Sequence, residues 1–166
     1  MNKYLSLEDL ENSKDKILSF TINDYIDGID SVDPVCAQLN AVSMGEFVRV
    51  YGHVRAKVKL ICDLCLEEFV QEIDFDMDEM FTKNSLFEFS DSPGHEFEIK
   101  DGQFITDLEG KNEIDIYDLL YQSVILHYPN KKVCGINCKG RDFLSEDEIP
   151  DPRLDVFKNI QISENK

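Results

Sequence analysis

The sequence predicts an α+β fold that is mainly antiparallel β, arranged as a twisted sheet or a partial barrel. Two observations favour this class. Apolar and polar residues alternate along 46–62 and again along 67–81, which is the period of strands with one buried face. Along 115–128 the apolar residues instead recur at helical spacing, so we expect one clear helix there and only short helices toward the termini.

The chain has 166 residues without a repeat or an evident linker. We therefore expect a single domain, 1–166, with flexible ends at about 1–16 and 161–166. The leading segment could also be helical.

The first half of the chain is expected to be β-rich. Residues 17–24 alternate as a strand, and a turn-rich loop then runs to Pro34. After this proline, a second strand places four apolar side chains on one face: Val35, Ala37, Leu39 and Ala41. Cys36 falls on the opposite face, and we expect it to be a buried, unreactive small side chain.

The two alternating segments 46–62 and 67–81 predict a long hairpin. A turn centred between Asp63 and Leu64 satisfies both faces of the hairpin in one register. The expected charged pairs are Lys59–Glu68, Arg55–Glu72, His53–Asp74 and Arg49–Asp78, and the expected apolar pairs are Val58–Phe69, Val54–Ile73 and Val50–Met77.

The second half is less regular until the helix. Short strands are expected around 86–89, 96–99 and 103–107 within an acidic, turn-rich stretch. The helix at 115–128 has Asp115 as its N-cap and is stopped by Pro129. A further short helix is expected at 153–160.

Two cysteine pairs carry the main functional signal. Cys62 and Cys65 lie at the predicted hairpin turn, and Cys134 and Cys138 follow the helix. Pairs with two or three intervening residues are the usual halves of a four-cysteine zinc site, so we predict one structural zinc ion as the cofactor. Two alternatives stay open: a metal-free cluster in which the thiols pack together, and a thioredoxin-like dithiol at Cys62 and Cys65. The dithiol is disfavoured because that motif opens a helix, whereas this one joins two strands.

Positive charge is concentrated beside the cysteines, although the net charge of the chain is −17. Candidate contacts to RNA or another partner are Lys57, Lys59, Lys131, Lys132, Lys139 and Arg141. The competing interpretation of the hairpin face is that Arg49, Arg55 and Lys59 are neutralised by Asp78, Glu72 and Glu68. No acidic residue lies within 131–141, so this second cluster is the better RNA candidate.

Other function classes are excluded or weakened. The sequence has no apolar leader and no membrane-length apolar run, and its five cysteines do not suggest a disulfide framework. We therefore expect a soluble, cytoplasmic protein that binds no membrane. The sequence carries no Ser-His-Asp set, phosphate loop or dinucleotide fingerprint, so we expect neither an enzyme nor a small-molecule substrate.

Several motifs together resemble the YceD-like family, whose members are called large ribosomal RNA subunit accumulation proteins. These are "CDLCL" at 62–66, "LHYP" at the helix end, "CGINCKG" at 134–140 and "DPRL" at 151–154, and the resemblance covers about 35–160. It implies a non-enzymatic factor in large ribosomal subunit biogenesis, with ribosomal RNA or a large-subunit ribosomal protein as partner. Many members carry another cysteine pair after C-K-G, where this chain has "RDFLSEDEI". A different class also stays open, an acidic module that binds a basic ribosomal protein without RNA.

Overall fold

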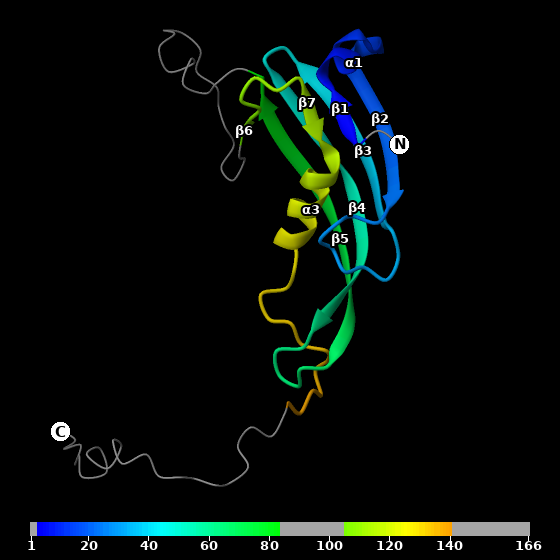
Figure 1. Cartoon of the computed structure of the whole chain (residues 1–166), viewed down its shortest axis with the longest axis vertical. Helices are drawn as coiled ribbons and strands as arrows, with labels where there is room; N and C mark the ends of the chain where they lie inside the picture. The colour runs from blue at the N-terminus through cyan, green and yellow to red at the C-terminus, as the bar shows by residue number, and fades with distance from the viewer. Residues whose placement is uncertain (1–2, 84–104, 141–166) are drawn as a thin grey trace, which may run out of the picture.

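The structure is a computed structural model that describes residues 3–83 and 105–140. Its elements, shown in Figure 1, are β1 (Tyr4–Ser6), α1 (Leu7–Asn12), the 3-10 turn η1 (Lys14–Lys16), β2 (Ile17–Asp24), β3 (Val35–Met44), β4 (Phe47–Ile61), β5 (Glu68–Thr82), β6 (Ile105–Asp107), β7 (Glu113–Asp115) and α3 (Ile116–Leu126).

The main sheet has five strands in the order β2-β3-β4-β5-β6. Neighbours from β2 to β5 are antiparallel, and β6 adds in parallel to β5. A second, two-stranded sheet pairs β1 with β7. The result is an open sheet with one clear helix, which confirms the predicted α+β class. The hairpin β4–β5 reaches beyond the other strands to one end of the molecule (Figure 1).

The observed hairpin register differs from the predicted one by two residues. Lys59 lies opposite Val70, Arg55 opposite Asp74 and His53 opposite Asp76. A shift of two keeps every side chain on its predicted face, so the alternating pattern cannot distinguish the two registers. The hydrogen bonds of the turn select the observed register. The N–H of Cys62 donates to the carbonyl of Glu67, so that Ile61 and Glu68 become the last paired residues before the turn.

The strand after Pro34 is confirmed, but the prediction for Cys36 is wrong. Val35, Ala37, Leu39 and Ala41 are all buried, as expected. Cys36 is exposed, because the opposite face of β3 faces solvent at this end of the strand and nothing among the described elements covers it.

The N-terminal segment contributes to the core. Leu5, Leu7 and Leu10 are buried in the main hydrophobic cluster, and the side chain of Ser6 caps α1 by accepting from the N–H of Asp9. Neither β1 nor its partner β7 was predicted, since each is only three residues long.

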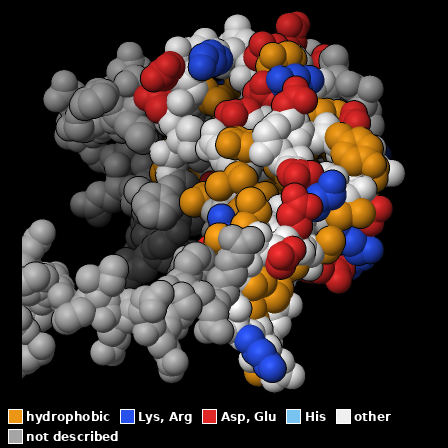
Figure 2. All heavy atoms as spheres, turned by 60° about the horizontal axis from the view of Figure 1, so that its bottom comes forward, with side chains coloured by type: hydrophobic (Ala, Val, Ile, Leu, Met, Phe, Trp, Pro, Cys, Tyr) orange, Lys and Arg blue, Asp and Glu red, His pale blue; other side chains and the backbone are white. Residues whose placement is uncertain are grey.

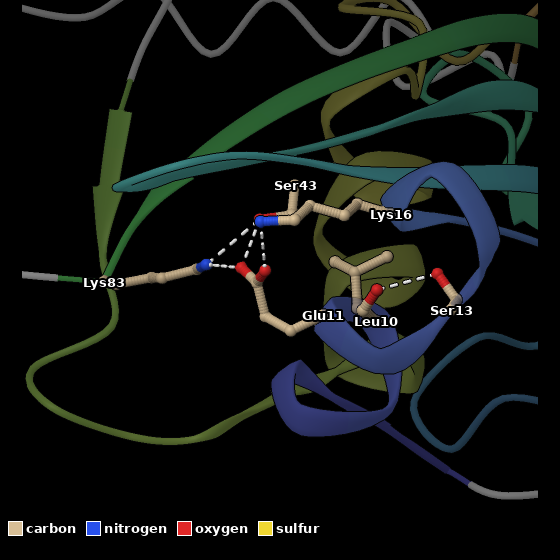
Figure 3. A network of polar contacts seen from close by, with 6 residues as sticks. All are labelled: Leu10, Glu11, Ser13, Lys16, Ser43 and Lys83. Atoms are coloured by element: carbon tan, nitrogen blue, oxygen red, sulfur yellow. Dashed lines mark hydrogen bonds and ion pairs between the residues drawn. The ribbon is translucent and has the colours of Figure 1, made fainter.

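A charged network anchors α1 to the sheet. Glu11 of α1 accepts hydrogen bonds from Lys83 and Ser43 and forms an ion pair with Lys16 (Figure 3). The hydrogen bonds from Lys16, Lys83 and Ser43 lower the pKa of Glu11 to about 2. This network joins three separate parts of the chain at the end of the molecule that carries α1.

Helix α3 covers the inner face of β5. Asp115 caps it as predicted, accepting from the N–H groups of Tyr117 and Asp118. Ser123 donates to the sulfur of Met77, and the ring of His127 stacks on Phe75 with centroids 3.7 Å apart. His127 therefore has a packing role at the helix end.

β6 corresponds to the strand expected at 103–107. Other predictions cannot be compared with the structure. The strands expected at 86–89 and 96–99, the helix expected at 153–160 and the motif at 151–154 lie outside the described residues.

Candidate metal centre

The structure brings all four predicted cysteines together at the free end of the hairpin. Their sulfur atoms all lie within 4.8 Å of one another. The closest separations are 3.7 Å between Cys62 and Cys138 and 3.7 Å between Cys65 and Cys134. All four are free thiols.

The two shortest separations match those of a four-coordinate metal. In a tetrahedron with metal–sulfur bonds of about 2.3 Å, as zinc prefers, neighbouring sulfur atoms are about 3.8 Å apart. Each short contact joins one cysteine of the first pair to one of the second. The cluster therefore could hold a metal ion, with one ligand from each of four positions.

Backbone hydrogen bonds hold the two cysteine segments against each other. The N–H of Asp63 donates to the carbonyl of Lys132 over 2.7 Å, and the N–H of Lys132 donates to the carboxylate of Asp63 over 2.8 Å. The segment after α3 thus returns along the hairpin and ends beside its turn (Figure 1). Sequence spacing could not have predicted this return path.

Each segment is also a tight turn. The N–H of Leu66 donates to the carbonyl of Cys62, and the N–H of Cys138 donates to the carbonyl of Gly135. Leu66 adopts a positive φ of 62°. Turns of this kind direct two thiols toward one point.

Two of the clustered thiols, Cys62 and Cys134, have pKa values shifted in opposite directions. The N–H of Cys65 is the main cause that lowers the pKa of Cys62 to about 6, with the N–H groups of Cys134 and Leu64 adding to it. Hydrogen bonds with Cys138 and Cys65 are the main causes that raise the pKa of Cys134 to about 12. The cluster thus shares its protons unequally, and a bound divalent cation would displace them.

Lysines beside the cluster have no acidic partner among the described residues. Lys131 and Lys139 are exposed and Lys132 is partly exposed, and none of the three forms an ion pair with any residue of 3–83 or 105–140. Arg141 lies outside the described residues.

The basic hairpin face is different, because its charges are paired. Lys57 contacts Asp33 at 3.4 Å and Lys59 contacts Asp30 at 3.5 Å. The expected pairing of Lys59 with Glu68 is wrong, and Lys57, a candidate contact for which no acidic partner was predicted, is paired as well. The reason is that β4 extends beyond β3, so the loop before β3 lies against it there and forms a bridge between Ser31 and Val58.

The remaining cations on this face are paired within the hairpin. Arg49 contacts Asp78 through two hydrogen bonds of 2.7 Å, as predicted. Arg55 pairs with Asp74 in place of Glu72, and His53 lies between Asp74 and Asp76. The register shift explains why Arg55 exchanges Glu72 for Asp74 and why His53 gains Asp76 while it keeps the predicted contact with Asp74.

The comparisons with known proteins gave one match. The model of a family described as "Large ribosomal RNA subunit accumulation protein YceD" matches residues 50–160, which is more than half of the chain and includes all four clustered cysteines. No curated protein and no solved structure matched. Among the described residues, no helix has the length and apolar character needed to cross a membrane.

Proposed function

The chain belongs to the YceD family of large ribosomal RNA subunit accumulation proteins, and from this premise we propose that it is a non-enzymatic factor that contacts large-subunit ribosomal RNA during ribosome biogenesis. The contact surface is the lysine cluster Lys131, Lys132 and Lys139, here called the knuckle lysines, with Arg141 beside it. The proposed place of action is the cytoplasm.

The observation that carries this proposal is the contrast between two sets of cations. Lys57, Lys59, Arg49 and Arg55 all face a carboxylate at 3.5 Å or less. The knuckle lysines have no such partner among the described residues, and lysines of this kind are the usual contacts to phosphate groups. On a chain with a net charge of −17, they form a local site on a surface that otherwise repels nucleic acid.

The proposed cofactor is one structural zinc ion held by Cys62, Cys65, Cys134 and Cys138. Four protein ligands leave no open coordination position for a substrate, which is typical of structural sites and fits a protein without catalysis. A zinc ion with four thiolates would fix the turns that carry the knuckle lysines.

Salt-titrated binding to fragments of large-subunit ribosomal RNA tests the RNA contact. Replacing Lys131, Lys132 and Lys139 together by Ala should weaken binding at least tenfold and reduce the salt dependence, because fewer counterions are released. The matched control replaces Lys57 and Lys59, which are already paired, and should change binding little.

The same experiment separates the alternative function. A protein that binds no ribosomal RNA but captures a basic ribosomal protein, in a manner that depends on Glu68, Glu72 and Asp74, would support the acidic interaction module. The structure gives less support to that module because Asp74 already contacts Arg55 and His53. Turnover of disulfides by Cys62 and Cys65 would support the dithiol.

A further inference from the structure

An exposed aliphatic side chain projects from the second cysteine turn. Ile136 has a relative exposure of 105%, which means that the side chain contacts almost nothing in the molecule. It lies between Cys134 and Cys138, in a turn closed by the hydrogen bond from Cys138 to Gly135. The turn is therefore held on both sides of Ile136 by residues of the thiol cluster.

Further aliphatic side chains lie at the same end of the hairpin. Leu64 and Leu66 are each 46% exposed, and Leu64 lies against Gly140 at the end of the second cysteine segment. Figure 2 turns this end of the molecule toward the viewer and shows hydrophobic side chains exposed among charged ones. Along the sequence, the knuckle lysines lie on both sides of Ile136.

The charges of this end define the chemistry of its partner. Residues 131–140 contain three lysines and no acidic residue, whereas the hairpin turn beside them carries the exposed acids Asp63, Glu67 and Glu68, of which Asp63 accepts from the N–H of Lys132. The lysine-bearing segment 131–140 therefore favours a partner that presents anions beside a surface able to accept an aliphatic side chain. Nucleic acid does so, because its phosphates border the grooves and the stacked bases.

The absence of aromatic residues distinguishes the form of nucleic acid. Neither 61–68 nor 131–140 contains Phe, Tyr or Trp. Proteins that bind single strands usually stack bases on aromatic side chains. Aliphatic residues instead act as wedges at base steps from the minor groove, and the minor groove of an RNA helix is wide and shallow enough to admit them.

We propose that Ile136 is an aliphatic wedge that enters the minor groove of a double-stranded RNA segment while the knuckle lysines contact the phosphates on either side. This inference rests on the proposed function and specifies the form of RNA that the site takes. The rigid turn limits the entropy lost when the side chain is inserted.

The proposal is tested by measuring binding to a 20-base-pair RNA duplex of mixed sequence and to each of its separated strands. A second copy of the duplex carries 2-aminopurine at one base step as a fluorescent reporter of unstacking. The protein should bind the duplex more tightly than the single strands, and the 2-aminopurine fluorescence should rise when the base is unstacked. Ile136→Ser should weaken duplex binding about tenfold, abolish the fluorescence rise and leave the salt dependence unchanged.

Val70→Ser is the matched control, since Val70 is also an exposed aliphatic residue, at 56%, but lies on the outer face of β5. It should bind like the unchanged protein. Because Ile136 is exposed, its replacement should not alter folding, which circular dichroism and metal content will check.

The experiment distinguishes failure of the wedge from failure of the proposed RNA contact. Suppose that Ile136→Ser binds the duplex normally and still raises the 2-aminopurine fluorescence, while the triple lysine variant does not bind. The wedge is then refuted and the proposed function stands. Tighter binding of single strands also refutes the wedge alone. If no RNA is bound at all, both proposals are refuted.

Discussion

The thiol of Cys62 lies where several groups of the site converge. It is completely buried, accepts from the N–H of Cys134 over 3.4 Å and contacts the sulfur of Cys138 at 3.7 Å. The sequence predicted which four cysteines form the cluster, because their spacing is characteristic. It could not predict that Cys62 faces Cys138, since this depends on the path of residues 127–133.

At this scale, Cys134→Ser should abolish stoichiometric metal binding, because a hydroxyl is a poor substitute for a thiolate ligand. Elemental analysis of protein purified without chelator measures this. Cys36→Ser is the control, since Cys36 is exposed and lies outside the cluster, and it should retain the metal. Folded wild-type protein without metal would contradict the proposed zinc site and favour simple thiol packing.

Lys57 shows why charged pairs are harder to predict than cysteine sets. Its partner Asp33 lies 24 positions earlier in a loop, so neither strand alternation nor helical spacing relates the two residues. The chain has only five cysteines, so their pairs are easily recognised, whereas its 34 acidic residues offer each lysine several possible partners. Only the tertiary position of the loop selects one.

Among the elements, α1 is attached to the sheet by the carboxylate of Glu11 as well as by its buried leucines. Hydrogen bonds from Lys16, Lys83 and Ser43 lower the pKa of Glu11 from 4.5 to about 2. A lowered pKa means that the unfolded chain binds the proton more readily, so this contribution is present above pH 4.5 and is lost as the pH falls toward 2.

Glu11→Gln should therefore lower the free energy of unfolding at pH 7, and the difference from the unchanged protein should shrink as the pH is reduced from 4.5 to 2. Urea titrations across this range measure it. Glu46→Gln, an exposed change in the β3–β4 turn, should show no comparable pH dependence. A constant deficit for Glu11→Gln at every pH would contradict the role of the charge.

The β3–β4 pair also contains a position where an added side chain would overlap the backbone of the neighbouring strand. A Cβ atom at Gly52 would lie 2.0 Å from the carbonyl oxygen of Gln38, which is backbone and cannot rotate away. The alternation of apolar and polar residues predicts β4, but it does not indicate that Gly52 lies against the backbone of β3. Alternation reports which face is buried, and it does not report how closely two backbones approach.

Gly52→Ala should destabilise the protein by about 1–3 kcal/mol, because the backbone must shift to relieve the overlap. Gly135→Ala is the matched control, since nothing lies within 4 Å of its added Cβ, and it should change stability by less than about 0.5 kcal/mol. Thermal or urea unfolding compares the two. Equal stability of the two variants would contradict the close approach.

At the scale of the whole molecule, the hydrophobic core of the sheet and the second cysteine segment lie in different regions. Val48, Val50, Val54 and Val58 are completely buried within the sheet, whereas none of the residues 129–140 is buried. The patterning of β4 made the sheet core predictable. The end of the hairpin has no comparable core, so its order depends on backbone hydrogen bonds and on whatever links the four thiols.

Removal of the proposed zinc by a chelator should therefore loosen one end of the molecule without unfolding it. Hydrogen exchange measured by mass spectrometry should speed up in 60–68 and 127–140, because local opening there exposes few apolar contacts. The β3–β5 region should keep its protection, since its stability comes from apolar burial that the metal does not touch. Restoring zinc should restore protection at the hairpin end, and cooperative loss of protection throughout the sheet would show instead that the metal centre is required for the whole fold.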